Sequence, residues 1–151
     1  MGDRERQLKT AKQLLLEECG EILSASSVYE TAPWGKTDQP SFLNQALELQ
    51  TKLNAKQLIR RILKLEKMMG RERKEKFGPR IIDIDILLFN DEVYQYHFLK
   101  VPHPEMQNRR FALMPLSEIA GKVIHPIFNK PIDALLKECK DPLEVTYFAS
   151  A

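Results

Sequence analysis

Apolar residues recur along the chain with two periods, which together predict alternating helices and strands. Residues 3–19 carry a stripe at helical spacing, with Asp3 and Gly20 suited to begin and end that helix. Residues 55–69 predict a second amphipathic helix in the same way. The stripes consist of Leu8, Ala11, Leu14 and Leu15 in the first helix and Leu58, Ile62, Leu65 and Met69 in the second.

Alternation with a period of two predicts strands at residues 21–31, 42–51 and 81–89. The third is the clearest element of the chain. In the second, one face is expected to carry Leu43, Gln45, Leu47 and Leu49, and the other Phe42, Asn44, Ala46 and Glu48. After residue 89 the pattern predicts an irregular stretch, a helix over residues 110–119 and a last helix over residues 131–139.

This order of elements indicates a single α+β domain over residues 1–151. A split β-α-β, ferredoxin-like fold runs β-α-β-β-α-β, and the chain matches that order with its first strand absent. We therefore predict a ferredoxin-like α/β sandwich with a mainly antiparallel sheet. No repeat or linker rich in Pro, Gly or Ser divides the sequence.

Composition narrows the functional classes only slightly. With 43% hydrophobic and 29% charged residues the chain resembles an ordinary globular domain, which excludes disordered and fibrous classes. The net charge of +2 is too small to indicate a nucleic-acid partner by itself. No apolar run suggests a membrane span or a signal peptide, so a cytoplasmic protein is expected. Cys19 and Cys139 are interpreted as two buried free thiols rather than a disulfide or metal pair.

Two carboxylates in the strand at residues 81–89 give the strongest chemical signal. Asp83 and Asp85 should project from the same face about 6.6 Å apart, with Leu87 and Phe89 continuing that face as apolar surface. Paired carboxylates beside apolar surface are costly unless a cation meets them, and Mg²⁺ commonly binds one or two carboxylates together with substrate phosphates. The alternative is a polar edge strand facing water.

A basic segment precedes the carboxylates. Residues 60–80 contain nine basic and three acidic residues, a combination that suits a polyphosphate with its metal. Arg71, Arg73 and Arg80 are expected to fall outside the helix, flanked by Gly70 and Gly78-Pro79, and so are the better functional candidates. No Walker A sequence is present, so the site is not expected to be a P-loop. The bases within the helix are interpreted as a solvated face: Arg60, Arg61, Lys64 and Lys67.

Several other residues allow both a structural and a functional interpretation. Glu66 lies at the edge of the buried helix face, as a structural carboxylate or a ligand contact. His103 is held between two prolines, which fixes the direction of its ring. Phe42 with Asn44, and separately Trp34, could pack against and hydrogen-bond a planar heterocycle or belong to the core.

Together these residues resemble the bacterial 6-hydroxymethyl-7,8-dihydropterin pyrophosphokinases of folate biosynthesis. The motif closest to diagnostic is Gly78-Pro79-Arg80-Ile81-Ile82-Asp83-Ile84-Asp85. The likeness extends over nearly the whole chain, and its other matching segments occur in the family's order: residues 27–31, 38–44, 70–73, 101–104 and 109–111.

The resemblance implies transfer of the β,γ-pyrophosphoryl group of ATP to the pterin hydroxymethyl oxygen, with release of AMP. It implies that Asp83 and Asp85 hold two Mg²⁺ ions along the triphosphate, and that Arg71 and Arg80 are catalytic cations. On the ATP side it implies Glu66, Arg73, Ile86, Lys100, His103 and Arg109, and around the pterin Thr31, Pro33, Trp34, Phe42, Asn44 and Phe111.

The chain departs from the family at its start. The family opens with a strand and a Gly-Ser-Asn-Leu-Gly-Asp-Arg turn, whereas Met1 here stands at that Leu, before Gly2-Asp3-Arg4. We therefore expect the natural chain to begin upstream. The alternative functions are a catalytically inactive relic that still binds pterin or nucleotide and, less favoured, a basic RNA-binding module; neither a nucleic-acid nor a membrane partner is expected.

Overall fold

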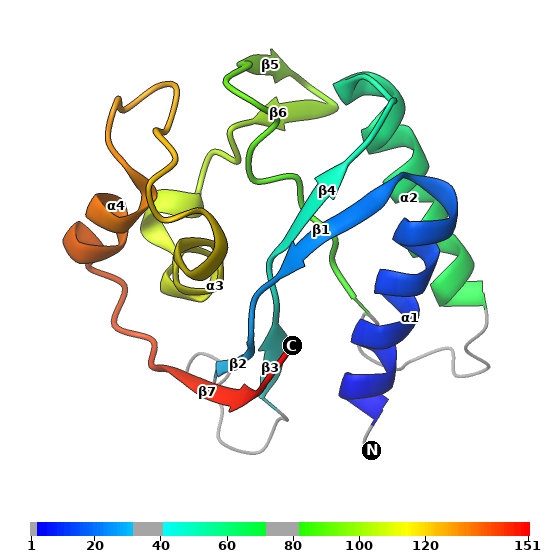
Figure 1. Cartoon of the computed structure of the whole chain (residues 1–151), viewed down its shortest axis with the longest axis horizontal. Coiled ribbons are helices and arrows are strands. Elements are labelled where there is room, and N and C mark those ends of the chain that lie inside the picture. Colours follow the sequence, from blue (N-terminus) through cyan, green and yellow to red (C-terminus); the bar gives the residue numbers. More distant parts are fainter. Residues whose placement is uncertain (1–2, 32–40, 72–81) are drawn as a thin grey trace.

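The computed structural model describes residues 3–31, 41–71 and 82–151, the side chain of Arg71 excepted. All four predicted helices are present (Figure 1). The helices are α1 (Asp3–Glu18), α2 (Ala55–Arg71), α3 (Arg110–Ala120) and α4 (Ile132–Glu138), with a short 3-10 helix η1 (Met106–Asn108). The strands are β1 (Glu21–Ala25), β2 (Val28–Thr31), β3 (Phe42–Asn44), β4 (Leu47–Gln50), β5 (Tyr94–Tyr96), β6 (Leu99–Val101) and β7 (Val145–Ala149).

The predicted apolar stripes build the core on one side of the strands. Leu58, Ile62, Leu65 and Met69 of α2 are all buried, and the stripe of α1 buries Ala11 and Leu15. Asp3 is the first residue of α1 rather than the residue before it. The two helices and β4 enclose one apolar cluster, since leucines of β4 pack against buried residues of both helices.

A second core lies between the strands and the C-terminal helices. It joins Ala46, just before β4, to Met106 of η1 and to buried residues of α3 and α4. In Figure 1 the pair α1 and α2 and the pair α3 and α4 lie on opposite sides of the strands. All strand pairs in the described residues are antiparallel, which confirms the predicted α+β class.

Two of the predicted strands are each divided into two, at facing positions. The segment at residues 21–31 forms β1 and β2, and the segment at residues 42–51 forms β3 and β4. Between them the buried Ser26 hydroxyl accepts a hydrogen bond from the N–H of Ala46 at 2.8 Å and donates to the carbonyl oxygen of Ser27 at 2.7 Å. Because a side chain takes over backbone partners here, the regular ladder is interrupted. β1 therefore pairs with β4, and β2 with β3.

The prediction of a strand at residues 81–89 is wrong for the part the structure describes. Residues 82–89 carry no strand assignment. The N–H of Ile84 donates to a carboxylate oxygen of Glu66, and the carbonyl oxygen of Leu87 accepts from the N–H of His103. These backbone groups thus bond to a helix side chain and a loop. Within the described residues β4 pairs with β1 alone.

Three short strands were not predicted from the sequence. β5 and β6 form an antiparallel hairpin within the stretch predicted to be irregular. β7 pairs with the free side of β2, which gives the order β3-β2-β7. The strand β7 therefore anchors the end of the chain beside the β2–β3 pair.

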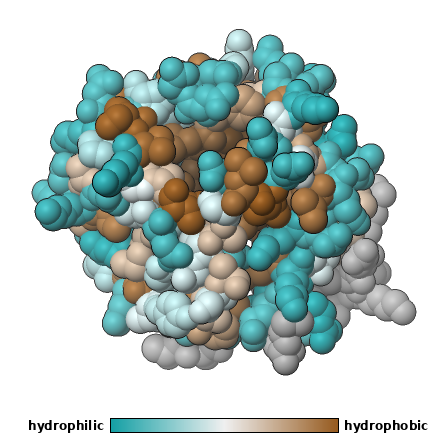
Figure 2. Space-filling model, viewed as in Figure 1, coloured by the Kyte–Doolittle hydropathy of each residue, from teal (hydrophilic) through white to brown (hydrophobic). Residues whose placement is uncertain are grey.

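The surface in Figure 2 is hollowed beneath the β5–β6 hairpin, and apolar side chains are visible in that hollow.

Both cysteines are buried and free, as predicted. In the described part of the chain, no helix combines the length and the hydropathy needed to cross a membrane.

Candidate active site

The two aspartates of residues 82–89 lie on the exposed side of a segment whose other residues are anchored. Asp83 and Asp85 are exposed, while the intervening Ile84 and the next residue, Ile86, pack against the core between α1 and α2. Leu87 packs toward the other core, beside α3 and α4. The predicted common face of the two carboxylates is thus supported. Phe89, which was expected to continue that face, packs instead with Ile84 and Ile86.

Glu66 of α2 holds this segment by its backbone. Its Oε2 accepts a hydrogen bond of 2.7 Å from the N–H of Ile84, the residue between the aspartates. Glu66 is half-buried. The observed bond matches the structural alternative for Glu66; its contact with ATP remains a prediction.

His103 connects the loop after β6 to the aspartate segment. Its backbone N–H donates to the carbonyl oxygen of Leu87 at 3.0 Å, and its ring Nδ1 accepts from the N–H of Glu105 at 3.2 Å. In the neutral ring this pattern assigns the proton to Nε2, which can then donate to a ligand. The peptide bond between Val101 and Pro102, one residue before His103, is cis.

Three neighbouring charges act on the pKa of His103. Burial lowers this pKa below its ordinary value, Asp85 and Glu105 act to raise it, and the positive charge of Arg109 acts to lower it. Because the net direction is downward, the ring is neutral at pH 7. Asp85 and Arg109, predicted from separate motifs, thus both lie near enough to His103 to influence its pKa.

Arg109 and Phe111 extend the site to the start of α3. Arg109 immediately precedes the helix, and its guanidinium carbon lies 5.8 Å from the centroid of the Phe111 ring. The helix α3 contacts β2 and β3. Phe111 therefore stands in the element that joins the region of Asp85 and His103 to these two strands. Lys100 lies exposed on β6.

The remaining described candidates lie on β2 and β3. Thr31 and Phe42 are register partners, and the Nδ2 of Asn44 donates to the Oγ1 of Thr31 at 3.0 Å. Thr31 is buried at 3% exposure, whereas Phe42 is 58% exposed. The hydrogen bond fixes the carboxamide of Asn44 beside an exposed aromatic ring. The prediction that Arg71 falls outside the helix is wrong, because Arg71 is the last residue of α2. Its side chain and four further predicted positions lie outside the described part of the chain: Pro33, Trp34, Arg73 and Arg80.

Arg4, which was not predicted as a site residue, contacts β2 and the residue that precedes β3. Its Nη1 donates to the carbonyl oxygen of Ser41 at 2.8 Å and to Oε2 of Glu30 at 3.0 Å. Arg4 stands at the Arg of the family's opening turn, but no role in the site was predicted for it. Only the fold brings α1 to the β2–β3 pair.

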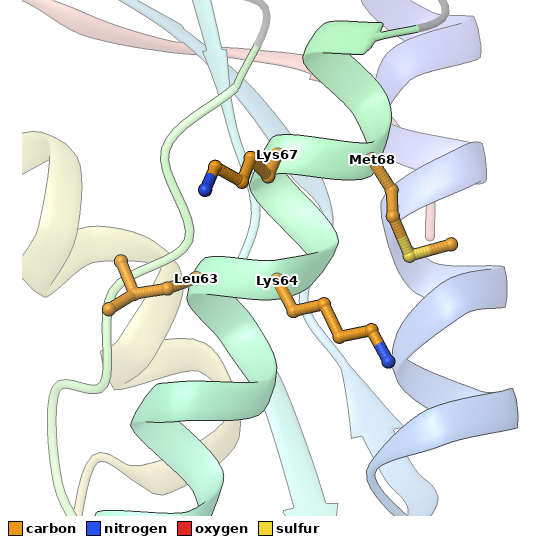
Figure 3. Close-up of a pocket in the computed structure, with 4 residues that line it drawn as sticks. All are labelled: Leu63, Lys64, Lys67 and Met68. Atoms are coloured by element: carbon orange, nitrogen blue, oxygen red, sulfur yellow. The ribbon is translucent and has the colours of Figure 1, made fainter.

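A pocket of about 570 Å³ lies elsewhere, along the outer side of α2. It is lined by Leu63, Lys64, Lys67 and Met68; Leu63 and Lys67 point toward the segment that leads to β5, and Lys64 and Met68 toward α1 (Figure 3). No described site residue lines it. The exposure of Arg60, Lys64 and Lys67 confirms the predicted solvated face. Arg61 differs, because its Nη1 donates to the carbonyl oxygen of Glu18 at 2.8 Å and so ties α2 to α1.

Comparison with known proteins gives the family. Residues 1–121 match the 7,8-dihydro-6-hydroxymethylpterin-pyrophosphokinase family, HPPK. The chain belongs to this family. It is 47% identical over 132 residues to the 2-amino-4-hydroxy-6-hydroxymethyldihydropteridine pyrophosphokinase of Aquifex aeolicus, covering 87% of this chain and 82% of that protein. The protein of the same name from Bacillus subtilis is 44% identical over 124 residues, covering 82% and 74%.

A plant relative places the same unit within a longer chain. The mitochondrial folate synthesis bifunctional protein of Pisum sativum is 39% identical over 124 residues, which cover 82% of this chain and 24% of the plant protein. HPPK membership confirms the resemblance drawn from the motifs, and with it the ferredoxin-like fold and the pyrophosphokinase function in folate biosynthesis.

Proposed function

We propose that this HPPK chain transfers pyrophosphate from ATP to 6-hydroxymethyl-7,8-dihydropterin in a reaction that depends on Mg²⁺. The pterin hydroxymethyl oxygen forms a bond to the β-phosphorus as the bond from that phosphorus to the α,β-bridging oxygen breaks. AMP leaves with the bridging oxygen, and the hydroxyl proton passes to solvent. The observation that carries the proposal is the exposed carboxylate pair, Asp83 and Asp85, with Asp85 near enough to His103 to influence its pKa.

The carboxylate pair suits a hard divalent cation. Asp83 and Asp85 offer oxygen ligands on an exposed surface, where water and phosphate oxygens can complete the coordination. No cluster of three or more metal-ligating residues occurs among the residues described, which accords with an ion held largely by substrate. Bound Mg²⁺, two ions on this proposal, neutralises charge on the triphosphate.

The residues around His103 form the proposed ATP side. The neutral His103 ring donates from Nε2 to an oxygen of the nucleotide, and the guanidinium of Arg109 supplies a fixed positive charge beside it. Lys100 contributes a second, exposed cation from β6. The remaining proposed contacts to ATP are Glu66, Arg73 and Ile86.

The β2–β3 pair and the start of α3 form the proposed pterin side. Asn44, oriented by its bond to Thr31, hydrogen-bonds the polar edge of the ring through its free carbonyl oxygen. Phe42 and Phe111 pack against the ring faces. The other proposed pterin contacts are Pro33 and Trp34. Transfer then depends mainly on positioning and charge neutralisation, to which Arg71 and Arg80 contribute as the proposed catalytic cations.

Substitution of the carboxylates tests this function. We expect Asp83→Ala and Asp85→Ala each to abolish pterin-dependent AMP release and the Mg²⁺-dependent part of ATP binding, measured by calorimetry with and without Mg²⁺. Asp91→Ala is the matched control, because this aspartate is also exposed but lies after the segment. Wild-type turnover in Asp85→Ala would refute the metal role.

Arg80→Ala separates catalysis from pterin binding. We expect it to slow the chemical step in single-turnover assays while the Kd for the pterin stays within about threefold of the wild type, since a cation acting on the transferred group matters most in the transition state. A weaker pterin Kd with an unchanged single-turnover rate would assign Arg80 to binding instead.

A further inference from the structure

We infer that Arg4 is a positioning residue for the pterin: it clamps the two strands that carry Thr31, Phe42 and Asn44, and so controls affinity for the pterin and not for ATP. The inference rests on the proposed function. The sequence motifs do not indicate this role for Arg4. It is inferred from the contacts of the Arg4 side chain.

The guanidinium of Arg4 joins three parts of the molecule to α1. Its Nη1 lies 3.0 Å from Oε2 of Glu30, in β2, and 2.8 Å from the carbonyl oxygen of Ser41, just before β3. Its central carbon lies 5.6 Å from the ring centroid of Phe148, in β7. One planar cation thus contacts β2, β7 and the residue that precedes β3, which together belong to the sheet β3-β2-β7.

The clamped positions adjoin the pterin candidates directly. Glu30 precedes Thr31, and Ser41 precedes Phe42, while Thr31 and Phe42 are register partners. Successive side chains of a strand point to opposite faces, so the carboxylate of Glu30 leaves the face on which Thr31 bonds to Asn44. Arg4 therefore holds the strand pair from behind the proposed pterin face, without needing to touch the pterin.

Partial burial makes this contact stronger than a typical surface ion pair. The side chains of Arg4 and Glu30 are 39% and 32% exposed, and the same nitrogen also bonds a backbone carbonyl. An isolated exposed pair stabilises little, whereas hydrogen bonds that involve a charged group are roughly twice as strong as neutral ones. Without Arg4, Glu30 and Ser41 lose a shared donor, and the spacing of the two strands at this rung is less restricted.

The predicted ATP residues are held by different contacts. Asp83 and Asp85 flank Ile84, which is bonded to Glu66 of α2, and His103 is bonded to Leu87 and Glu105. The clamp and these contacts lie on separate elements. Loss of the clamp should therefore change pterin binding selectively.

The test compares Arg4→Gln with the matched control Arg6→Gln. Arg6 lies on the same helix, is 67% exposed and has Asp3 at 3.9 Å, so its substitution removes an equal charge without touching the strands. The readouts are the KM for each substrate, kcat, and the Kd for 6-hydroxymethylpterin by fluorescence. We expect Arg4→Gln to raise the pterin KM and Kd at least fivefold, with the KM for ATP within twofold, and Arg6→Gln to match the wild type.

Two further variants guard against a purely structural explanation. Arg4→Lys keeps the charge but loses the planar guanidinium, so its pterin Kd should lie between those of the wild type and Arg4→Gln. Glu30→Gln should weaken pterin binding less than Arg4→Gln, because the hydrogen bond from Arg4 to Ser41 remains. A general loss of folded protein would lower kcat and leave both KM values unchanged. A pterin KM and Kd within twofold of the wild type in Arg4→Gln, or an equal change in both substrates, would overturn the inference. Wild-type protein that neither binds the pterin nor releases AMP would overturn the proposed function instead.

Discussion

The hydrogen bond from Ile84 to Glu66 leads to a quantitative prediction for the carboxylate segment. Glu66→Ala removes a half-buried carboxylate that accepts the N–H of Ile84 at 2.7 Å. A hydrogen bond to a charged group contributes about 1.5–3 kcal/mol, and its loss leaves the Ile84 N–H without this acceptor. We therefore expect the free energy of unfolding to fall by about 1.5–3 kcal/mol. Glu66→Gln, which keeps a neutral acceptor, should cost about 1 kcal/mol.

The assay is urea denaturation, with the change read from the midpoint at an unchanged slope. Glu17→Ala, on an exposed position of α1, is the control and should stay within about 0.5 kcal/mol of the wild type. Calorimetric binding of Mg-ATP is measured on the same variants. Because Ile84 separates the two aspartates, its release should also weaken Mg²⁺-dependent ATP binding.

The two interpretations of Glu66 predict different results. If Glu66 positions the aspartates, stability and Mg-ATP affinity fall together. If it only contacts ATP, affinity falls while the free energy of unfolding stays within about 0.5 kcal/mol of the wild type, a change typical of surface sites. The second result would refute the reasoning from the Ile84 bond.

Three further predictions follow from individual contacts. Thr31→Val removes a buried hydroxyl that accepts a hydrogen bond from the Asn44 amide, and should raise the pterin KM about fivefold, as expected for ~1 kcal/mol, at an unchanged KM for ATP. Thr31→Ser keeps the hydroxyl, so its pterin KM should stay near the wild type. The same pterin KM in Thr31→Val and Thr31→Ser would contradict this prediction. The hydrogen bond to Glu118 raises the pKa of Tyr29 to about 12, so this stabilisation is complete below pH 10 and is lost as pH rises through about 12. The pKa of Tyr94 is also raised, by its hydrogen bond to Glu92, so the ultraviolet titration of Tyr29→Phe should lose only part of its late component. A late component of unchanged amplitude would refute the assignment. Gly20 has φ +157°, and a Cβ there would overlap the carbonyl oxygen of Gln50. Gly20→Ala should therefore lower the free energy of unfolding, measured by thermal denaturation, by more than about 3 kcal/mol, because backbone strain and steric overlap act together. Near-wild-type stability would show that this turn can rearrange.

The sequence predicted the helices because their apolar stripes are long and regular. Every residue of the stripe in α2 is buried, and the period of 3.6 leaves little ambiguity over four turns. Strands were harder to predict, since a strand also needs a partner. Residues 82–89 have the expected composition, but two of their backbone groups bond to Glu66 and His103. The breaks beside Ser26 depend on a side-chain hydroxyl replacing a ladder bond, which no alternation reveals.

The candidate site was predictable where its residues form local motifs. Asp83 and Asp85 share the exposed side expected from their spacing, and His103 lies near Asp85 and Arg109 although separate motifs contain them. Arg4 could not be found in this way. It lies far along the chain from Glu30 and Ser41, and only the packing of α1 against the strands brings it there.

The most direct test of the central claim is the product analysis of one reaction. Purified protein is incubated with Mg-ATP and 6-hydroxymethyl-7,8-dihydropterin, and nucleotides and pterins are separated and quantified, with Asp83→Ala as the control. We expect equal amounts of AMP and pterin pyrophosphate, formed only when Mg²⁺ and the pterin are both present. Folded protein that releases no AMP, or that releases ADP in its place, would contradict it.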